Sequence, residues 1–292
     1  MNGADEAVDT LVVGHVTRDR LDTGVFPGGT AYYAALTHAA FGSRVLLNTR
    51  ADPSFDVAEV LAQTVAGIEV HVTPDEVTTE FENRYDASGQ RTQWVHAVAG
   101  SVAPSHQLPA VDVLHLAPVL GEVDPTVWID AVDARVVTLS VQGWLRRLVP
   151  QTSSTAAQVV RTAWAPASEL LSRVHLVVLS REEAGVDGLL ARLRDHVETV
   201  VVTDAEHGCR VFSSGKTSHV GIYPARVVDP TGAGDTFAAT MAHGLARGLD
   251  APVAAQLGAA AASISIEATG AAALRRLREA EARATSIVIT SE

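Results

Sequence analysis

The sequence VVDPTGAGDTFAATMAHGLARG, at residues 227–248, joins a short apolar run, a glycine-rich turn and an alanine-rich amphipathic segment. This order predicts a turn that leads directly into a helix. Gly232, Ala233 and Gly234 carry almost no side chain, so their backbone N–H groups can approach an anion closely, and the positive end of the helix dipole points the same way. The stretch therefore predicts a phosphate site at the start of a helix.

Asp235 follows this turn and falls in the first turn of the expected helix. A carboxylate beside an anion is unfavourable unless it has a chemical role, and accepting a proton from an attacking hydroxyl is such a role. The alternative is a tight turn in which Asp235 only caps the helix. Average composition would produce D-x-x-G-A-G-D by chance about once in a few thousand chains of this length, which favours the general base.

Outside this stretch, short apolar β-branched runs alternate with alanine-rich segments, which is typical of an α/β protein with a mainly parallel sheet. Most of the runs are continuously apolar, as expected when helices cover both faces of the sheet. Core strands are expected at residues 8–15, 44–48, 68–72, 111–117, 135–140, 174–180 and 199–204.

Two segments read instead as β-hairpins. Residues 78–98 alternate polar and apolar side chains about the turn DASGQ, which predicts either a small lid or an edge hairpin without a role. Trp94 in this segment could stack on a ligand or pack the hairpin. Residues 210–220 predict a second hairpin that turns at 213–215. The Gly-Lys-Thr at its tip is not a P-loop, because that motif needs a glycine where this chain has Arg210.

The segment Asp229–Asp235 resembles the C-terminal signature of the ribokinase-like (PfkB) carbohydrate kinases. Gly28-Gly29-Thr30-Ala31 is similar to the N-terminal glycine-pair signature of that family, and Gly14 and Asp19 match the spacing of its early glycine and sugar-binding aspartate. The resemblance covers nearly the whole chain. It implies one three-layer ribokinase-like domain over residues 1–292, with helices on both sides of the sheet and a small β lid formed mainly by 78–98 with a contribution from about 16–26.

The resemblance also implies a reaction, the transfer of the γ-phosphoryl group of ATP to a hydroxyl of a monosaccharide or polyol. Asp235 would be the general base, and the amides of residues 232–234 would stabilise charge on the transferring group. Mg²⁺ would neutralise the phosphates, with Glu183 ordering its water shell. Asp229 matches a position that helps to bind K⁺ in some members.

Further residues are expected around the substrates. By resemblance, Asp19, Gly28 and Gly29 would hold acceptor hydroxyls, whereas Thr203, Gly208 and Thr231 would lie near the nucleotide. Arg146 follows an expected strand end, where ligand residues collect in open α/β sheets, so it meets a substrate or phosphate, or forms a surface salt bridge.

The chain departs from the family pattern at several positions, listed here: Thr17, Tyr33, Arg50, Ser180 and Ala205. Ser180 replaces the asparagine of an Asn-x-x-Glu motif and alters the expected metal shell. These departures leave two alternatives, a nucleoside kinase of the same fold and a catalytically silent nucleotide- or sugar-binding module. Asp235 and its flanking glycines speak against the silent module, which has no need of a base.

Composition narrows the remaining classes of protein. The 292 residues include 22 Lys and Arg against 34 Asp and Glu, a formal charge of −12, which argues against a nucleic-acid partner. The eleven histidines are scattered, the basic run at 274–283 alternates with glutamate at helical spacing, and Cys209 is alone in the sequence. The N-terminus lacks the pattern of a signal peptide, and no run reaches the ~18 apolar residues of a membrane span. We therefore expect a cytoplasmic protein without a membrane partner, and some relatives pair through their lids, which makes a homodimer compatible with the resemblance.

Overall fold

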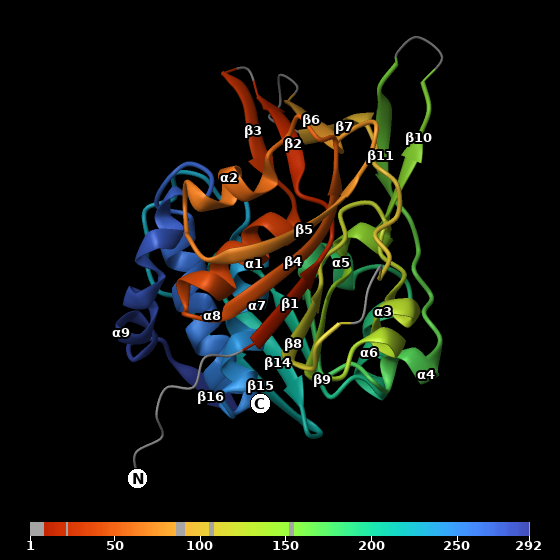
Figure 1. Cartoon of the computed structure of the whole chain (residues 1–292). Coiled ribbons are helices and arrows are strands. Elements are labelled where there is room, and N and C mark those ends of the chain that lie inside the picture. Colours follow the sequence, from red (N-terminus) through yellow and green to blue (C-terminus); the bar gives the residue numbers. More distant parts are fainter. Residues whose placement is uncertain (1–8, 22, 86–90, 105–107, 152–154, 292) are drawn as a thin grey trace.

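The computed structural model describes residues 9–291 except 22, 86–90, 105–107 and 152–154. A ten-stranded sheet forms the centre, in the order β16-β15-β14-β13-β12-β9-β8-β1-β4-β5 (Figure 1). The strands from β13 to β5 in this order are parallel, and β14, β15 and β16 extend the sheet antiparallel. The sheet is therefore mainly parallel, as the sequence predicts.

The strands of this large sheet are β1 (Asp9–Val13), β4 (Arg44–Ala51), β5 (Ile68–Pro74), β8 (Val111–Leu116), β9 (Ala134–Ser140), β12 (Leu176–Ser180), β13 (Thr199–Thr203), β14 (Cys209–Ser213), β15 (Lys216–Val220) and β16 (Ile289–Ser291). All seven expected core strands are confirmed to within a few residues, and β14 and β15 are the hairpin expected at 210–220. Strand β16 was not expected, because three residues carry too little pattern to be recognised.

Helices cover both faces of the large sheet, so the domain has three layers. Along β1, Val12 packs toward one helical layer, whereas Leu11 and Val13 pack toward the other. The first layer contains α1 (Thr30–Ala40), α2 (Val57–Ala62), α7 (Ala233–Ala246), α8 (Ala251–Ser265), the 3-10 helix η3 (Ala272–Glu279) and α9 (Ala280–Ala284). The second contains α3 (Pro125–Ala131), α4 (Ser168–Leu171) and α6 (Leu189–His196). The short helices η1 (Val141–Leu145), α5 (Arg181–Ala184) and η2 (Ala205–His207) follow β9, β12 and β13.

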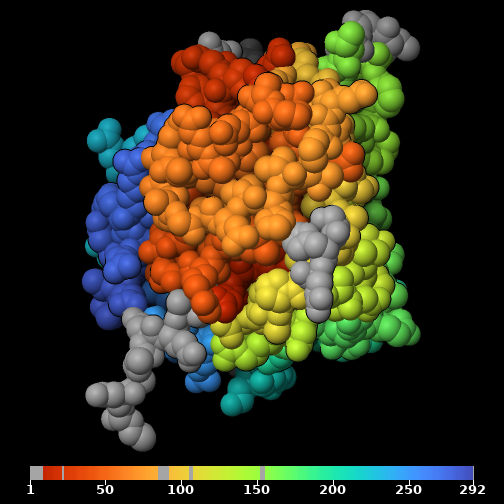
Figure 2. All heavy atoms as spheres, viewed as in Figure 1, coloured from red at the N-terminus to blue at the C-terminus, as the bar shows by residue number. Residues whose placement is uncertain are grey.

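A second, small sheet lies at the end of the large sheet where the parallel strands finish (Figure 1). Its order is β10-β11-β7-β6-β2-β3. The strands are β2 (Thr17–Leu21), β3 (Gly24–Gly28), β6 (Glu80–Tyr85), β7 (Arg91–Ala97), β10 (Arg146–Val149) and β11 (Ala157–Arg161). The hairpin expected at 78–98 is confirmed as β6 and β7, and its expected turn at 86–90 lies outside the described residues. Figure 2 shows parts of β2, β3 and the β10–β11 region, which are far apart in sequence, gathered at this end of the molecule.

Arg50, one of the departures from the family pattern, has a structural role here. It lies in β4 and donates from Nε to Asp75 Oδ2 at 2.5 Å and from Nη1 to the Ser101 carbonyl at 3.3 Å. The Gly100 N–H and the Arg50 guanidinium both stabilise the Asp75 carboxylate and lower its pKa to about 2. Arg50 therefore ties the large sheet to the loop that follows the β6–β7 hairpin.

The structure shows the surroundings of two features of the sequence, Cys209 and the basic run at 274–283. Cys209 is buried, and burial raises the pKa of its thiol to about 12, which fits the small apolar filler expected from the sequence. The basic run is not one α-helix, because it divides between η3 and α9, with Leu274 and Leu277 buried.

None of the helices in the described part of the chain is long and apolar enough to cross a membrane.

Two histidines lie fully buried between α1 and the large sheet. His38 on α1 meets His115 on β8 with 3.3 Å between Nε2 and Nδ1, and His115 Nε2 lies 2.9 Å from Ser140 Oγ. Burial lowers the pKa of His115 to about 3 and holds the pKa of His38 well below its usual value. Both side chains are therefore neutral in the folded protein.

We expect these histidines to make the protein less stable as the pH falls from about 6.5 to 5. The unfolded chain takes up protons on both histidines in this range while the folded chain does not. Each histidine should lower the free energy of unfolding by about 1.4 kcal/mol per pH unit. Urea unfolding at pH 7, 6 and 5 measures the slope. It should be measured in an Asp235→Asn background, because burial raises the pKa of Asp235 to about 6 and this carboxyl titrates in the opposite sense.

A His115→Gln variant provides the control, because glutamine keeps hydrogen-bonding capacity and does not titrate. It should remove about half of the slope. A slope that is the same with and without His115 would contradict the assignment.

Candidate active site

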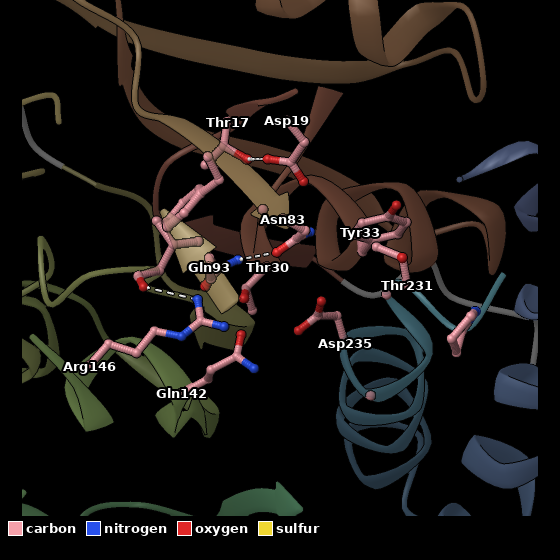
Figure 3. A pocket seen from close by; sticks show the side chains of 16 residues that line it. Thr17, Asp19, Thr30, Tyr33, Asn83, Gln93, Gln142, Arg146, Thr231 and Asp235 are labelled. Atoms are coloured by element: carbon pink, nitrogen blue, oxygen red, sulfur yellow. Dashed lines mark hydrogen bonds between the residues drawn. The ribbon is translucent and has the colours of Figure 1, made fainter. Parts of the chain in front are cut away.

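A pocket of about 250 Å³ lies where the small sheet meets the start of α7. It contains several of the residues singled out in the sequence, and Figure 3 shows their side chains directed toward a common space. The lining residues are Thr17, Asp19, Gly29, Thr30, Tyr33, Phe81, Asn83, Gln93, Val119, Gln142, Arg146, Pro230, Thr231, Gly232, Gly234 and Asp235. We call this the acceptor pocket.

The glycine-rich turn begins α7, as the sequence predicts. Gly232 is the N-cap residue with φ of 76°, and a Cβ atom there would lie 2.3 Å from the Tyr33 ring, so packing and backbone both require glycine. Gly234 differs, because a Cβ there would meet no atom of the described residues within 4 Å. Glycine at 234 therefore leaves open space beside the turn.

The amides of this turn do not all face the open space. The Ala233 N–H donates to the Pro230 carbonyl at 3.3 Å, and the Thr236 N–H donates to Gly232 at 2.8 Å. Within the described chain, the N–H groups of Gly232, Gly234 and Asp235 have no hydrogen-bond acceptor. These N–H groups are the donors of the turn that could bind an anion, and Gly232 and Gly234 belong to the set expected from the sequence.

Asp235 lies in the first turn of α7 and faces the acceptor pocket (Figure 3). Burial raises the pKa of its carboxyl to about 6, and the charge of Glu183 acts in the same direction. The Arg146 guanidinium and a hydrogen bond from Thr30 oppose this rise. A carboxyl with this pKa can hold and release a proton near neutral pH, as a general base requires.

Thr30, in the first turn of α1, is a site residue that sequence reasoning did not single out. Its side chain is buried and donates to Asp235.

We expect Thr30→Val to raise the pKa of Asp235, because the carboxylate loses a donor that stabilises it. In an assay of phosphoryl transfer to a hydroxyl acceptor, the pH below which kcat/KM falls should move to a higher value, and Thr30→Ser should restore the wild-type value. If kcat/KM of the valine variant still falls at about pH 6, Thr30 does not have this role.

Asp19, Gly28 and Gly29 lie together at the acceptor pocket, where Gly28 contacts Asp19, and their role in holding acceptor hydroxyls stays a prediction. Asp19 on β2 accepts a hydrogen bond from Thr17 Oγ1 at 2.8 Å. A Cβ at Gly28 on β3 would lie 2.3 Å from Asp19 Oδ2, so glycine there makes room for the carboxylate. Gly29 caps α1 with φ of 92° and lines the acceptor pocket. Thr17, one of the departures from the family pattern, thus positions Asp19.

Arg146 begins β10 and lies in the wall of the acceptor pocket. Its Nη1 donates to the Val119 carbonyl at 3.3 Å, and its guanidinium lies 6.0 Å from the centre of the Phe81 ring. Its charge lowers the pKa of Asp235 across the pocket. This placement favours contact with a substrate or phosphate over a salt bridge on the outer surface.

A second pocket of about 580 Å³ lies on the other side of the turn, and we call it the donor pocket. It shares Pro230 and Gly234 with the acceptor pocket, so the two spaces meet at the start of α7. Its remaining lining residues are Ser180, Thr203, Ala205, Glu206, Gly208, Ile222, Tyr223, Ala225, Val227, Ala233, Phe237, Ala259, Ala262, Ser263 and Ile266. Thr203 and Gly208 thus lie where the nucleotide is expected. Thr231, also expected there, lies in the wall of the acceptor pocket.

Glu183 lines a neighbouring pocket together with Arg146 and Ser180, and Ser180 holds it in place. Ser180 Oγ accepts from the Glu183 N–H at 3.2 Å, and Glu183 Oε2 accepts from the Ser180 N–H at 2.7 Å. This capping box fixes the carboxylate at the start of α5. Mg²⁺ in enzymes commonly uses one or two carboxylates together with water and phosphate oxygens, so a fixed Glu183 near Asp235 fits such an ion.

Asp229 connects the glycine-rich turn to the loop after α8. One carboxylate oxygen accepts from the Thr231 N–H at 3.0 Å and the other from the Gly270 N–H at 2.8 Å. Burial raises the pKa of Asp229, but these hydrogen bonds outweigh it and leave the pKa below its usual value. Asp229 is therefore an anion that also shapes the turn, and a role in binding K⁺ stays a prediction.

The small sheet contributes polar groups that the sequence analysis did not identify as ligands. Asn83 and Gln93 line the acceptor pocket, whereas Trp94 lies on the other face of the hairpin, with the Arg84 guanidinium 4.7 Å from its ring centre. Trp94 therefore packs the hairpin. The alternation at 78–98 could have indicated that Asn83 shares a face with Phe81, but not that this face lines a pocket.

Solved structures show the same fold. A pyrophosphate-dependent kinase in the ribokinase family, complexed with a pyrophosphate analog and myo-inositol, matches with a TM-score of 0.76 and 22% identity, over 93% of this chain and 99% of that one. Arabidopsis thaliana ribokinase complexed with ribose and ATP matches with a TM-score of 0.68 and 18% identity, over 95% of this chain and 99% of that one. The three-layer fold with its small β sheet is thus a ribokinase fold, as expected.

The sequence also matches a family description, pfkB family carbohydrate kinase, over residues 71–276. The chain belongs to this family, which confirms the resemblance carried by the glycine-rich turn. Inositol 3-kinase of Zea mays is 46% identical over 93 residues, which are 32% of this chain and 24% of that protein. The matched segment thus spans about a quarter of the length of this relative.

Proposed function

We propose that this protein transfers the γ-phosphoryl group of ATP to a hydroxyl of a cyclic polyol or monosaccharide, with an inositol as the first candidate. The observation that carries the proposal is the meeting of two pockets at one turn. Asp235 faces the acceptor pocket, and Gly234 lines both pockets. A hydroxyl in one pocket and a phosphate chain in the other would therefore meet beside a carboxyl and open backbone amides.

The acceptor pocket suits a small neutral molecule with many hydroxyls. Its polar groups are carboxylates, hydroxyls, amides and one guanidinium, which together can donate to and accept from a polyol. The apolar part of its lining, which includes Phe81, Val119 and the Tyr33 ring, is small beside these polar groups, which makes the nucleoside-kinase alternative less favourable. The similarity to inositol 3-kinase supports an inositol among the polyols.

The donor pocket supports ATP over pyrophosphate. A pyrophosphate-dependent relative needs only an anion site, but here the anion turn adjoins a larger cavity lined by apolar side chains, among them Ile222, Val227, Phe237 and Ile266. An adenine ring is flat and largely apolar on its faces, so such a cavity would bury it favourably. Pyrophosphate would leave the cavity unused.

The arrangement supports an in-line transfer. The acceptor oxygen forms a bond to the γ-phosphorus, the bond from that phosphorus to the β-γ bridging oxygen breaks, and ADP leaves with that oxygen. Asp235 takes the proton of the attacking hydroxyl, and the N–H groups of Gly234 and Asp235 stabilise charge on the phosphoryl oxygens. Bound Mg²⁺, ordered by Glu183, would neutralise charge on the phosphates. K⁺ near Asp229 would strengthen the same anion site.

The small sheet would act as a lid in this scheme, because it supplies one wall of the acceptor pocket and its closure would exclude water as a competing acceptor. Its edge strand β3 exposes Val25 and Phe26, and the neighbouring Leu21 on β2 is also exposed. We propose that a homodimer forms through this edge, as sheet edges readily pair. The proposal includes a cytoplasmic location, because ATP is available there.

The test is ADP release by purified protein with MgATP, with and without K⁺, across myo-inositol, ribose, fructose, adenosine and cytidine. The wild-type protein should turn over myo-inositol far faster than the Asp235→Asn variant does. Pyrophosphate should replace ATP poorly. Preferred turnover of a nucleoside would favour the second candidate, and no turnover with ATP binding intact would favour the silent module.

A further inference from the structure

One arginine outside the donor pocket holds two residues of its wall. Tyr223 and Ser263 both line the pocket. Arg283 belongs to α9, and its guanidinium lies over the Tyr223 ring, 4.7 Å from the ring centre. Its Nη1 also donates to Ser263 Oγ at 3.1 Å. Arg283 therefore joins two parts of the wall that are distant in sequence, the 221–228 segment and α8.

The 221–228 segment has little regular structure that could fix the Tyr223 ring. It belongs to no helix or strand. Among the described residues, its backbone hydrogen bonds are at its two ends, where the N–H groups of Gly221 and Val228 donate to carbonyls outside the segment at 3.0 and 2.7 Å. Tyr223 lies between these points, so the orientation of its ring depends on side-chain contacts. The cation–π contact with Arg283 favours a ring that turns one face toward the guanidinium.

Arg283 is itself held firmly. Its two terminal nitrogens donate to both carboxylate oxygens of Glu267 at 3.0 Å, and its side chain is only 13% exposed. A planar guanidinium that binds a carboxylate through several N–H groups has a fixed plane. Cation–π contacts are also stronger when the cation is removed from water. Arg283 can therefore keep the Tyr223 ring in one orientation.

The Tyr223 ring gives the donor pocket an aromatic surface beside aliphatic side chains such as those of Ala225, Ala259 and Ile266. The faces of an adenine ring are flat, and stacking on an aromatic ring adds to the gain from apolar burial. Because the guanidinium lies over one face of the Tyr223 ring, a nucleobase would meet its other face or its edge. The position of Arg283 thus determines which surface of Tyr223 the pocket offers.

We propose that Arg283 is a positioning residue for the nucleotide donor, which orients Tyr223 and Ser263 so that this wall of the donor pocket binds the nucleobase. This inference rests on the proposed function and names a residue that determines donor affinity from outside the pocket. Arg283 acts through the two wall residues and takes no part in the bond changes at phosphorus.

Arg283→Met tests the proposal, because methionine keeps an unbranched apolar side chain and removes the guanidinium. The affinity for MgADP, measured by calorimetric titration, should fall at least ~10-fold, and KM for ATP should rise by a similar factor. The kcat at saturating ATP and the KM for the acceptor should change less than about 2-fold, because the acceptor pocket and Asp235 are untouched. Arg283→Lys should restore part of the ADP affinity, since lysine keeps the charge.

A double-mutant cycle tests whether Arg283 acts through Tyr223. Tyr223→Leu should itself lower the ADP affinity, because the aromatic surface is lost. In that background, Arg283→Met should lower the affinity much less than it does in the wild type, since the ring that it orients is absent. Fully additive losses would contradict an action through Tyr223.

Arg276→Met is the matched control. Arg276 is part of the same charge cluster, and its hydrogen bonds go to Glu267 and Glu279. It should leave the ADP affinity unchanged. If Arg276→Met and Arg283→Met lowered the affinity equally, the cluster would only stabilise this end of the chain, and the inference would be overturned.

Thermal unfolding shows whether each variant is folded. Should Arg283→Met not fold, Arg283→Lys and the Tyr223→Leu background give the same comparison. Wild-type ADP affinity in a folded Arg283→Met variant would overturn the inference while the proposed function stands. A wild-type protein that binds neither MgATP nor MgADP would overturn the proposed function itself.

Discussion

Asp235→Asn should lower kcat by at least ~10²-fold, because the amide cannot accept the proton of the attacking hydroxyl. Binding of ATP should stay close to wild type, since the change keeps the shape of the side chain and the first turn of α7. The measurement is steady-state turnover with the best acceptor, together with calorimetric titration of ATP. The wild-type protein should also lose kcat/KM as the pH falls through about 6, the pKa that burial gives this carboxyl.

Asp250→Asn is a suitable comparison, because Asp250 also stands at the start of a helix, α8, and makes no side-chain capping hydrogen bond there. Its turnover should match the wild type. If Asp235→Asn retained nearly full turnover, Asp235 would be a helix-start residue without a chemical role, and the proposed base would have to be abandoned.

Gly234→Val should weaken ATP binding at least ~10-fold and lower turnover further, because the new side chain would fill the space through which the phosphate reaches the backbone amides. The folded state itself should tolerate the change, since a Cβ at this position meets no described atom within 4 Å. Gly234→Ala should even leave stability unchanged or raise it by up to about 1 kcal/mol, as alanine favours helices over glycine. Nucleotide titration and urea unfolding measure the two effects separately.

Gly221→Ala is the comparison for this prediction, because Gly221 has no left-handed backbone and a Cβ there would lie 3.6 Å from the Val288 carbonyl oxygen, an ordinary contact. It should change neither ATP binding nor turnover. Normal ATP affinity and rate in Gly234→Val would show that the turn is structural only, whereas loss of folding would show that Gly234 is needed by the chain itself.

The parts of the fold that sequence predicted are those with a local signal. The continuous apolar runs predicted the parallel strands because most of them are buried on both faces, although β5, at the edge of the sheet, is only half-buried. The glycine-rich turn marked the start of α7 because it carries its own backbone requirements. The strands β10 and β11 carry no comparable signal. They have four and five residues and are mostly half-buried, so neither a long apolar run nor a clear alternation marks them.

The site was predictable where one short motif supplies the chemistry and less so where distant segments meet. Asp235, Gly234 and Asp19 were found from their motifs. The apolar donor cavity joins side chains from the ends of β12 and β13, the 222–227 segment, α7 and α8, and no single stretch announces it. Ser180 replaces the asparagine of the Asn-x-x-Glu motif, which predicted an altered metal shell. The structure shows that this serine caps α5 and fixes Glu183.

The small sheet has a consequence for recombination between relatives. Its strands come from three separate excursions of the chain, residues 17–28, 80–97 and 146–161, and each excursion leaves the large sheet and returns to it. Their pairing joins β2 to β6 and β7 to β11, so each excursion is stabilised by the others. A chimera that exchanges one excursion alone would therefore place foreign strand edges against native ones, and a change of acceptor by segment exchange would need all three together.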